Sequence, residues 1–222
     1  MKPLLLDLFC GAGGAAMGYH RAGFNVIGVD INPQPNYPFP ILQADALSVL
    51  RENRTLQPGF GPRVMEAAAI HASPPCQRYS AMSACRPGLA EEYPDLIGPT
   101  RELLKLMGLP YVIENVPGSP LIDPVTLCGQ MFGLDLYRHR LFESNISIVA
   151  LEHPQHVMPA SKAGHWTPGT VMSVAGHCAP IAKAREVMGI DWMNRAELGE
   201  SIPPLYTECI GAQLIEALEV AA

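Results

Sequence analysis

One cysteine stands where a reactive side chain would be expected. Cys76 follows an apolar run and two prolines, in residues 73–77 (Ser-Pro-Pro-Cys-Gln). Ligands of α/β proteins bind outside the carboxyl ends of the strands, so a rigid Pro-Pro turn at such an end would present the thiol to a ligand. Its thiolate could attack carbon 6 of a cytosine ring, which creates an enamine able to accept a one-carbon electrophile at carbon 5. The alternative is that Cys76 only fills the core, as most isolated cysteines do.

Three charged residues further along the chain could complete that chemistry. Glu114 ends a second apolar run and could hold or protonate ring N3 of the base. Arg138 and Arg140 are candidate cations that would stabilise both the thiolate and the carbonyl oxygen of the base. The alternatives are a helix cap for Glu114 and ordinary surface positions for the two arginines.

A glycine-rich turn indicates a cofactor site. Residues 7–14 (Asp-Leu-Phe-Cys-Gly-Ala-Gly-Gly) place glycines where a strand turns into a helix, which allows a ligand to approach bare backbone. Asp30 ends the next strand, about 20 residues beyond the first glycine, where it could accept hydrogen bonds from ribose hydroxyls, and Asp45 ends the third strand in a similar way. The turn lacks both the G-x-G-x-x-G and the P-loop spacing, so it favours an adenosyl cofactor.

These residues need a sheet that brings distant segments to one edge. Apolar runs of strand length alternate with helical segments, which predicts an α/β fold with a doubly wound, mostly parallel sheet. Strands are predicted at 4–9, 25–30, 41–43, 68–72, 111–114 and 146–150, and helices at 15–22, 46–53, 98–107, 182–188 and 205–220. The last helix is expected to pack back onto the sheet. Four prolines in residues 32–40 predict an irregular surface loop.

Composition limits the class of protein. The chain has 222 residues, of which 48% are hydrophobic and 16% charged, which suits one sizeable globular domain. No apolar run reaches the length of a membrane span, and the N-terminus does not resemble a signal peptide. The six cysteines form no C-x-x-C pair and show no regular spacing, which predicts neither a metal site nor a disulfide framework. A reducing cytoplasm is the expected compartment, which would be the host cytoplasm if the chain is viral.

One stretch of this acidic chain is basic. The formal net charge is -6, which disfavours nucleic-acid binding through bulk charge. Between Arg138 and Arg185 the balance reverses, and residues 151–182 are rich in Pro, Gly, His and Ser with little periodicity. This stretch is the candidate DNA-binding face, and a solvated basic loop without function is the alternative.

Taken in order, these motifs resemble those of the DNA cytosine C5 methyltransferases. Residues 7–14 resemble the first cofactor motif of that family, Asp30 its ribose-binding acid, 75–77 its catalytic Pro-Cys-Gln and 114–116 its Glu-Asn-Val. The remaining similarities are at Asp45-Ala46, 129–133, 138–140, 185–189 and 199–204. The similarity therefore runs through most of the chain.

The resemblance implies a role for each matching residue. Cys76 would be the nucleophile, Glu114 the partner of N3, and Arg140, with Arg138 beside it, the contact to the base oxygen of a cytosine flipped out of DNA. The implied contacts to S-adenosylmethionine are Phe9, Gly11, Ala12, Gly13, Asp30, Ile31, Asp45, Ala46, Pro74, Glu200 and Ser201. The implied DNA contacts are Gln77, Arg78, Ser80, Arg86 and Lys162, the first four on a loop over residues 77–93 that would close over the DNA. Residues 1–144 and 183–222 would form the catalytic and cofactor-binding domain, and 145–182 a reduced target-recognition segment.

Three departures from the family pattern carry expectations of their own. Leu136 replaces a glutamine of the arginine motif, which removes one polar contact. Only about 40 residues stand where the family inserts a large recognition domain, which predicts short or relaxed sequence specificity, as would suit modification of a whole bacteriophage genome. Glu200 replaces an asparagine near the amino-acid end of the cofactor, where a carboxylate would repel the carboxylate of S-adenosylmethionine unless it pairs with the amino group.

Alternatives remain open at this point. Glu200 could favour methylenetetrahydrofolate as the donor, and the same Cys76 enamine would then give 5-hydroxymethylcytosine. The substrate could be a free cytidine nucleotide in place of DNA. The chain could also be a non-catalytic homologue that binds DNA or a partner methyltransferase. The sequence makes no prediction of the oligomeric state.

Overall fold

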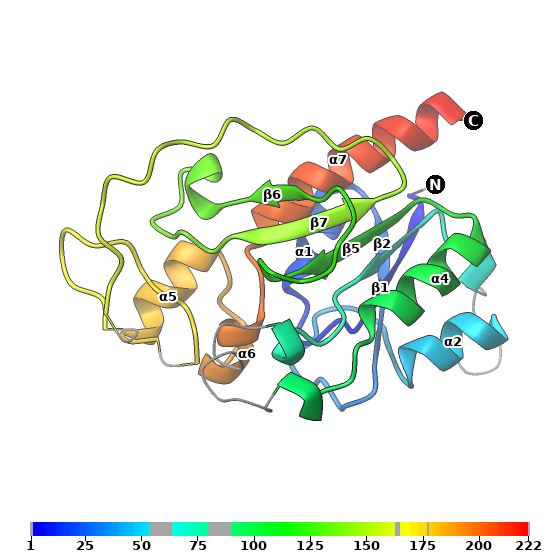
Figure 1. Cartoon of the computed structure of the whole chain (residues 1–222), viewed down its shortest axis with the longest axis horizontal. Coiled ribbons are helices and arrows are strands. Elements are labelled where there is room, and N and C mark those ends of the chain that lie inside the picture. The colour runs from blue at the N-terminus through cyan, green and yellow to red at the C-terminus, as the bar shows by residue number, and fades with distance from the viewer. Residues whose placement is uncertain (1, 54–63, 80–89, 163–164, 177, 222) are drawn as a thin grey trace.

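A seven-stranded sheet forms the centre of the molecule in the computed structural model, which describes residues 2–53, 64–79, 90–162, 165–176 and 178–221 (Figure 1). The strand order is β3-β2-β1-β4-β5-β7-β6. The strands are β1 (Leu4–Leu8), β2 (Asn25–Asp30), β3 (Ile41–Gln43), β4 (Ala69–Ala72), β5 (Tyr111–Asn115), β6 (Val125–Leu127) and β7 (Arg140–Ser144). Strand β7 pairs antiparallel with both β5 and β6, and the other strand pairs described here are parallel. The predicted mostly parallel α/β sheet is confirmed.

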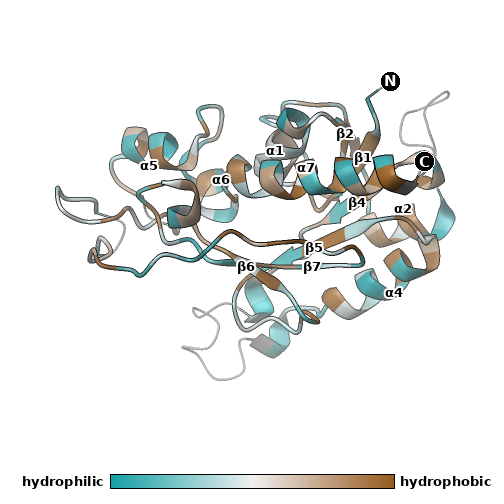
Figure 2. Ribbon diagram, turned by 90° about the horizontal axis from the view of Figure 1, so that it is seen from above, coloured by the Kyte–Doolittle hydropathy of each residue, from teal (hydrophilic) through white to brown (hydrophobic). Residues whose placement is uncertain are grey.

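Helices cover both faces of this sheet, so the doubly wound prediction is also confirmed (Figure 2). The helices are α1 (Gly14–Ala22), α2 (Ala46–Glu52), α4 (Ile97–Met107), α5 (Ile181–Met188), α6 (Arg195–Glu200) and α7 (Pro204–Ala221). Helices α1 and α7 lie on one face with α5 and α6, while α2 and α4 lie on the other. Short 3-10 turns occur at Val64–Glu66, Gln77–Tyr79, Ala90–Glu92 and Gly129–Phe132.

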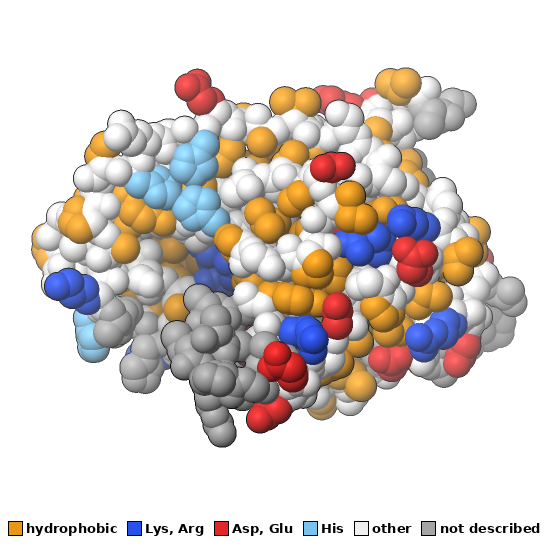
Figure 3. All heavy atoms as spheres, in the orientation of Figure 1, with side chains coloured by type: hydrophobic (Ala, Val, Ile, Leu, Met, Phe, Trp, Pro, Cys, Tyr) orange, Lys and Arg blue, Asp and Glu red, His pale blue; other side chains and the backbone are white. Residues whose placement is uncertain are grey.

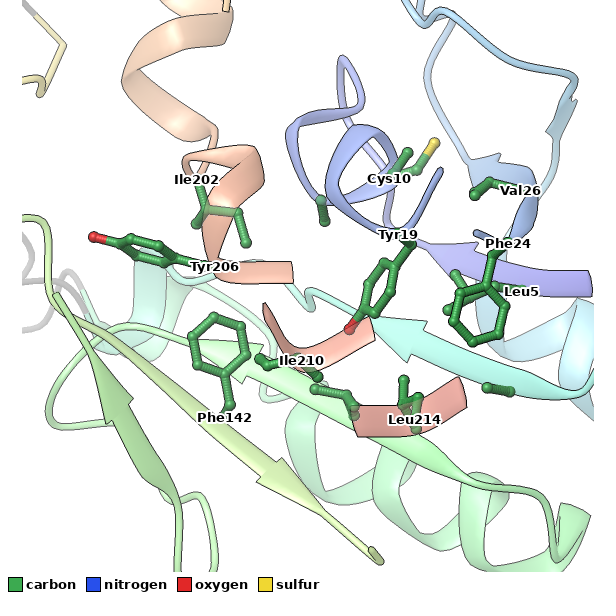
Figure 4. Close-up of a cluster of buried hydrophobic side chains, with 14 of the residues drawn as sticks. Leu5, Cys10, Tyr19, Phe24, Val26, Phe142, Ile202, Tyr206, Ile210 and Leu214 are labelled. Atoms are coloured by element: carbon green, nitrogen blue, oxygen red, sulfur yellow. The ribbon is translucent and has the colours of Figure 1, made fainter. Parts of the chain in front are cut away.

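Strand alternation divides the core into two layers. Successive side chains of a strand point to opposite faces, so Leu5 joins the cluster beneath α1 and α7, whereas Leu6 joins the cluster beneath α2 and α4. In the first layer, Tyr19 and Phe24 meet edge to face with ring centroids 6.1 Å apart. Figure 4 shows this layer, with Tyr19 of α1 and Phe142 of β7 among the labelled side chains. Both layers are apolar because parallel strands are buried on both sides.

The C-terminal helix packs back onto the fold as expected. Glycine allows α1 and α7 to approach closely, because a Cβ at Gly18 would lie 2.1 Å from the Pro204 carbonyl oxygen. The Thr207 hydroxyl donates to the Ala15 carbonyl oxygen at 2.8 Å. The same approach brings Ser201 against Gly14, where an added Cβ would lie 2.0 Å from the Ser201 Oγ. The start of α7 is thereby held beside the glycine-rich turn.

The sheet differs from the sequence prediction at its far edge. The predicted strand at 146–150 is wrong: these residues are irregular, and Ile146, Ile148 and Ala150 pack on the first core layer without pairing. Strands β6 and β7 and helix α6 were not predicted. Every other predicted helix and strand is observed, and its first and last residues agree with the prediction to within one residue. Residues 32–40 form an irregular loop as expected, but Tyr37 in that loop is buried.

A buried ion pair fastens α4 to β7. The Arg101 guanidinium donates to both carboxylate oxygens of Glu143 at 2.7 Å, and the two side chains are 10% and 5% exposed. Glu143 also accepts from the Ile122 backbone N–H at 2.8 Å. Without Arg101, the Glu143 carboxylate would therefore be a buried charge without a charged partner.

We expect Arg101→Met to lower the free energy of unfolding by about 3–5 kcal/mol, because a buried charge would lose its partner. The double variant Arg101→Met/Glu143→Leu should recover most of that loss, since it leaves no buried charge. Lys105→Met is the matched control, because Lys105 pairs with Glu102 at the surface and its removal should cost about 0.5 kcal/mol or less. Urea unfolding measures all three, and equal losses in the single and double variants would contradict the charge-based account.

Residues 145–180 contain no helix and no strand beyond isolated bridges in the part that the structure describes. One bridge pairs Leu136 with Met172, and the Met172 backbone N–H donates to the Asp135 carbonyl oxygen at 2.8 Å. The segment thus rests on the residues that precede β7. In the described part of the chain, no helix combines the length and apolarity needed to cross a membrane.

Candidate active site

A cavity of about 320 Å³ opens where β1, β2, β4 and β5 end. It brings together the two halves of the predicted site, the glycine-rich turn and the cysteine segment. The predicted residues that line it are Phe9, Gly11, Ala12, Gly13, Asp30, Ile31, Asp45, Ala46, Pro74, Cys76, Gln77, Glu114, Arg140, Glu200 and Ser201. Arg138, Arg78 and Lys162 do not line it, and Ser80 and Arg86 lie outside the described residues. Its volume is within the range of small-molecule sites.

The turn after β1 is shaped by left-handed backbone. Gly11 has φ +49° and Gly13 has φ +85°, conformations that favour glycine, and a Cβ at Gly11 would meet no atom within 4 Å. The Gly11 backbone N–H donates to Oδ2 of Asp30 at 3.0 Å, and the Asn32 N–H donates to Oδ1 at 2.9 Å. Asp30 is therefore held in place by the backbone on both sides, and each of its oxygens keeps acceptor capacity for a ligand.

Two further residues occupy the same end of the cavity. Ile31 follows Asp30, lines the cavity and is 63% exposed. Asp45 caps α2 by accepting from the Ser48 backbone N–H at 2.8 Å. The helix cap accounts for Asp45 structurally, whereas the exposure of Ile31 leaves apolar surface for a ligand to cover.

Cys76 stands at the opposite side of the cavity and is partly exposed. Asn115 holds the turn that carries it, because the Asn115 Nδ2 donates to the Pro74 carbonyl oxygen at 2.9 Å. Burial raises the pKa of the Cys76 thiol, the Glu114 carboxylate raises it further, and Arg140 opposes both. The thiol is thus protonated at rest, and removal of negative charge nearby would activate it.

Glu114 and Arg140 form an ion pair within the cavity. Arg140 Nε lies 3.1 Å from Glu114 Oε1, with both side chains largely buried. Strands β5 and β7 create the pair, because their antiparallel register puts Asn115 opposite Leu141 and so brings the start of β7 beside the end of β5. Burial raises the pKa of Glu114, while Arg140 and a hydrogen bond from Ser73 lower it. A carboxyl group with a raised pKa can share a proton with a ring nitrogen.

A buried hydrogen-bond chain leads to Glu114. The Tyr19 hydroxyl lies 3.0 Å from His71 Nδ1, and His71 Nε2 lies 2.8 Å from the Ser73 Oγ. Burial lowers the pKa of His71 to about 3, so the ring is neutral. Because Ser73 donates to Glu114, it must accept from His71 Nε2, and Nδ1 in turn accepts from Tyr19. The sequence analysis missed this chain, although His71 and Ser73 flank the strand end that precedes Cys76.

Arg138 does not line the cavity, whereas Arg140 does. Its guanidinium donates to the carbonyl oxygens of Val174 and Gly199, the latter at 2.7 Å. Burial, with Arg140 nearby, lowers the pKa of Arg138 to about 9. Its hydrogen bonds tie the irregular segment and the end of α6 to the start of β7, which is the arrangement of a positioning residue.

The end of α6 brings carboxylates to the glycine-rich turn. Glu200 is exposed and Ser201 is partly buried, and both line the cavity together with Glu197. Asn36 Nδ2 donates to both carboxylate oxygens of Glu197 at 3.0 Å, which fastens the proline-rich loop to α6. Sequence reasoning named Glu200 and Ser201 of this segment but missed Glu197.

The remaining predicted DNA contacts lie outside the cavity or at its rim. Gln77 lines the cavity, and Arg78 donates to the Tyr93 carbonyl oxygen at 2.8 Å. Lys162 is exposed in the irregular segment, where its backbone bridges to His165. Away from the cavity, Cys128 and three histidines lie together, a grouping that the cysteine spacing did not predict.

Two type II methyltransferases are similar to this chain in sequence. It is 26% identical over 163 residues to the type II methyltransferase M.AgeI of Thalassovita gelatinovora, which covers 62% of this chain and 38% of that protein. It is 30% identical over 131 residues to the type II methyltransferase M.XorII of Xanthomonas oryzae pv. oryzae, covering 53% of this chain and 29% of that protein. This chain is similar in sequence to part of each of these type II methyltransferases. The family resemblance of its motifs is thereby confirmed, although the match spans well under half of either relative. No family model matches the chain.

Solved structures confirm the methyltransferase fold. A prophage-encoded E. coli protein described as a DNA modification methyltransferase superimposes with a TM-score of 0.65 at 16% identity, covering 98% of this chain and 99% of that one. The S. pombe Dnmt2 methyltransferase and the Entamoeba histolytica methyltransferase EhMeth each give 0.62 at 14% identity, with the same coverage. At such identities the likeness concerns the fold alone.

Proposed function

We propose that this chain transfers a methyl group from S-adenosylmethionine to carbon 5 of cytosine in DNA, through a covalent bond between Cys76 and carbon 6. One observation carries the proposal. A single cavity joins a backbone turn suited to an adenosyl group with a cysteine, a buried carboxyl group and an arginine. The homology to type II methyltransferases supports DNA as the substrate.

The residues at the glycine-rich turn fit an adenosyl cofactor. Asp30 has free acceptor capacity for ribose hydroxyls, the bare backbone at Gly11 admits close approach, and Ile31 offers apolar surface to an adenine ring. When bound, S-adenosylmethionine would supply an electrophilic methyl group. Glu200 and Ser201 at the other end of the turn would contact its amino-acid part.

The charge of the cavity favours this donor over a folate. The lining contains six acidic residues, Asp7, Asp30, Asp45, Glu114, Glu197 and Glu200, and a single arginine, Arg140. Burial raises the pKa of Asp7 to about 8, so it adds little negative charge at neutral pH. S-adenosylmethionine carries a sulfonium and an ammonium group, whereas methylenetetrahydrofolate carries an anionic glutamate tail. Glu200 would then pair with the ammonium group, which removes the expected repulsion.

The other side of the cavity suits a cytosine ring. The Cys76 thiolate forms a bond to carbon 6 as the ring electrons move toward N3, where Glu114 holds the proton, and Arg140 faces the carbonyl oxygen. After carbon 5 has gained the new group, loss of its proton to a base and elimination of the thiolate restore the aromatic ring. Asn115 and Ser73 hold Cys76 and Glu114 in position for these steps.

We expect DNA incubated with the protein and S-adenosylmethionine alone to gain the mass of one methyl group at cytosine. Methylenetetrahydrofolate alone should leave the DNA unchanged, and free cytidine nucleotides should not react with either donor. Mass spectrometry of enzymatically digested DNA distinguishes these outcomes. 5-Hydroxymethylcytosine formed with the folate alone would overturn the donor assignment, and modification of free nucleotide would overturn the substrate.

The same reaction on random-sequence DNA tests the recognition segment. We propose that residues 145–182 read few base edges, so modified cytosines should occur in short or relaxed contexts. Sequencing of the modified positions measures this. Confinement to one site of about four or more base pairs would show that more recognition is present than the segment offers.

A further inference from the structure

Four side chains with metal-ligating atoms gather at the start of β7, apart from the cavity. Cys128, His139, His153 and His156 each offer one ligand atom, and these four atoms all lie within 4.8 Å of one another. We propose that they form a tetrahedral zinc site. Figure 3 shows histidine side chains gathered at one place on this face of the molecule.

Local structure explains how four residues distant in sequence converge. In the antiparallel pairing of β6 with β7, Leu127 lies opposite Arg140, so the next pair outward is Cys128 and His139. Two facing residues at the end of a ladder supply half of the site. The other half comes from the irregular segment, where His153 and His156 are spaced as H-x-x-H. That short spacing allows both rings to reach one ion.

The distances agree with tetrahedral zinc. With zinc bonds of about 2.0–2.1 Å to nitrogen and about 2.3 Å to sulfur, tetrahedral geometry requires nitrogen pairs about 3.3 Å apart and nitrogen–sulfur pairs about 3.6 Å apart. Nε2 of His139 lies 3.1 Å from Nε2 of His153, and Cys128 Sγ lies 3.3 Å from Nε2 of His156. These two pairs would open by a few tenths of an ångström as the ion binds, and the wider pairs among the four atoms, which are at most 4.8 Å apart, would close.

The ligand types select the metal and its role. One thiolate and three imidazoles suit zinc, whereas magnesium and calcium prefer oxygen ligands. Four protein ligands complete a tetrahedral shell and leave no position for water or substrate, which is typical of a structural zinc site. The ion would therefore hold chain segments together and take no part in the reaction.

The surroundings keep the ligands in place. The Tyr137 ring stacks on His156, with centroids 3.7 Å apart and planes 13° apart. The Tyr137 hydroxyl donates to the Met158 carbonyl oxygen at 2.6 Å and accepts from the Met158 N–H at 3.0 Å. These contacts fix the loop that carries His156 against the residues that precede β7, so the site is organised before the ion binds.

The position of the site gives it a consequence for the cavity. The His139 carbonyl oxygen accepts a hydrogen bond from Arg140 Nη1 at 2.8 Å, and Arg140 pairs with Glu114. Zinc would thus fasten residues 151–158 to the strand that carries Arg140. In so far as the proposed function holds, the ion links the recognition segment to the reacting base.

Metal content tests the proposal without any use of enzyme activity. The full chain, produced in zinc-supplemented medium and dialysed, should contain about one zinc ion per molecule. Cobalt in its place should show the intense visible absorption of tetrahedral coordination together with a thiolate charge-transfer band. His153→Ala and His156→Ala should each weaken zinc binding by about 100-fold or more, and neither removes core packing because both side chains are exposed. His165→Ala and Cys209→Ser, which lie outside the cluster, should retain the metal.

Thermal unfolding supplies the second measurement. A chelator should lower the melting temperature of the wild-type chain and leave that of the His153→Ala/His156→Ala double variant unchanged, since binding to the folded state alone stabilises it. A wild-type chain that stays free of metal after zinc loading would overturn the proposal. Zinc bound equally well by the double variant would overturn it as well.

Discussion

Replacement of Cys76 by serine is expected to reduce methyl transfer to DNA by about 10³-fold or more, because a serine hydroxyl is a much weaker nucleophile than a thiolate. The variant should fold normally, since the side chain is partly exposed at the cavity. Transfer of label from S-adenosylmethionine to DNA measures the loss. Cys209→Ser is the matched control, because Cys209 lies on α7 and does not line the cavity.

Covalent trapping on DNA tests the role of Cys76 without a measurement of turnover. DNA that contains 5-fluorocytosine should form a stable covalent complex with the wild-type chain and with Cys209→Ser, because fluorine at carbon 5 cannot leave as a proton does. Cys76→Ser should form none. An adduct that maps to another cysteine would contradict the assignment of the nucleophile. Absence of any adduct with the wild-type chain would favour a non-catalytic homologue.

Replacement of Glu114 by glutamine is expected to lower turnover by about 10² to 10⁴-fold, the range for loss of a positioned acid or base. The same change should make the Cys76 thiol more reactive. Burial and the Glu114 carboxylate both raise the pKa of that thiol and Arg140 lowers it, so an amide at position 114 removes one of the two effects that oppose Arg140. The thiol pKa must then fall.

The two effects have opposite signs, which separates them from misfolding. Alkylation of Cys76, followed by peptide mass spectrometry as a function of pH, should move to lower pH in Glu114→Gln while methyl transfer declines. Glu102→Gln, an exposed glutamate on α4, should change neither measurement. An alkylation curve that moves to higher pH would show that Glu114 does not face the thiol as a negative charge.

Much of the fold was predictable, since it rests on local pattern. Strands β1, β2, β4 and β5 are largely buried apolar runs, and such runs stand out in the sequence. Strand β7 does not, because it carries Arg140 and Glu143, whose charges are used in ion pairs with Glu114 and Arg101. The apolar residues at 146–150 imitate a strand although they only pack on the core.

The candidate site divides in the same way. Some features of the site are patterns of residue type over a few positions, so they could be recognised in the sequence. These are the glycines with positive φ, the aspartate at a strand end and the cysteine after two prolines. Glu197 and the Tyr19–His71–Ser73 chain could not, because each acts across a long separation in sequence. The position of Arg138 could not be predicted from the sequence either. Its guanidinium hydrogen-bonds to the carbonyl oxygens of Val174 and Gly199 and does not line the cavity.

The sequence by itself determined the class of fold and predicted the candidate reactive segment and the candidate cofactor turn, because these depend on residue type and short spacing. Only the tertiary structure decided which charges face one another. It set Glu114 against Arg140 through an antiparallel register, and it gathered Cys128 with three histidines through a ladder end and a returning loop. Electrostatic coupling and metal coordination depend on distances in space, and chain separation does not encode those distances.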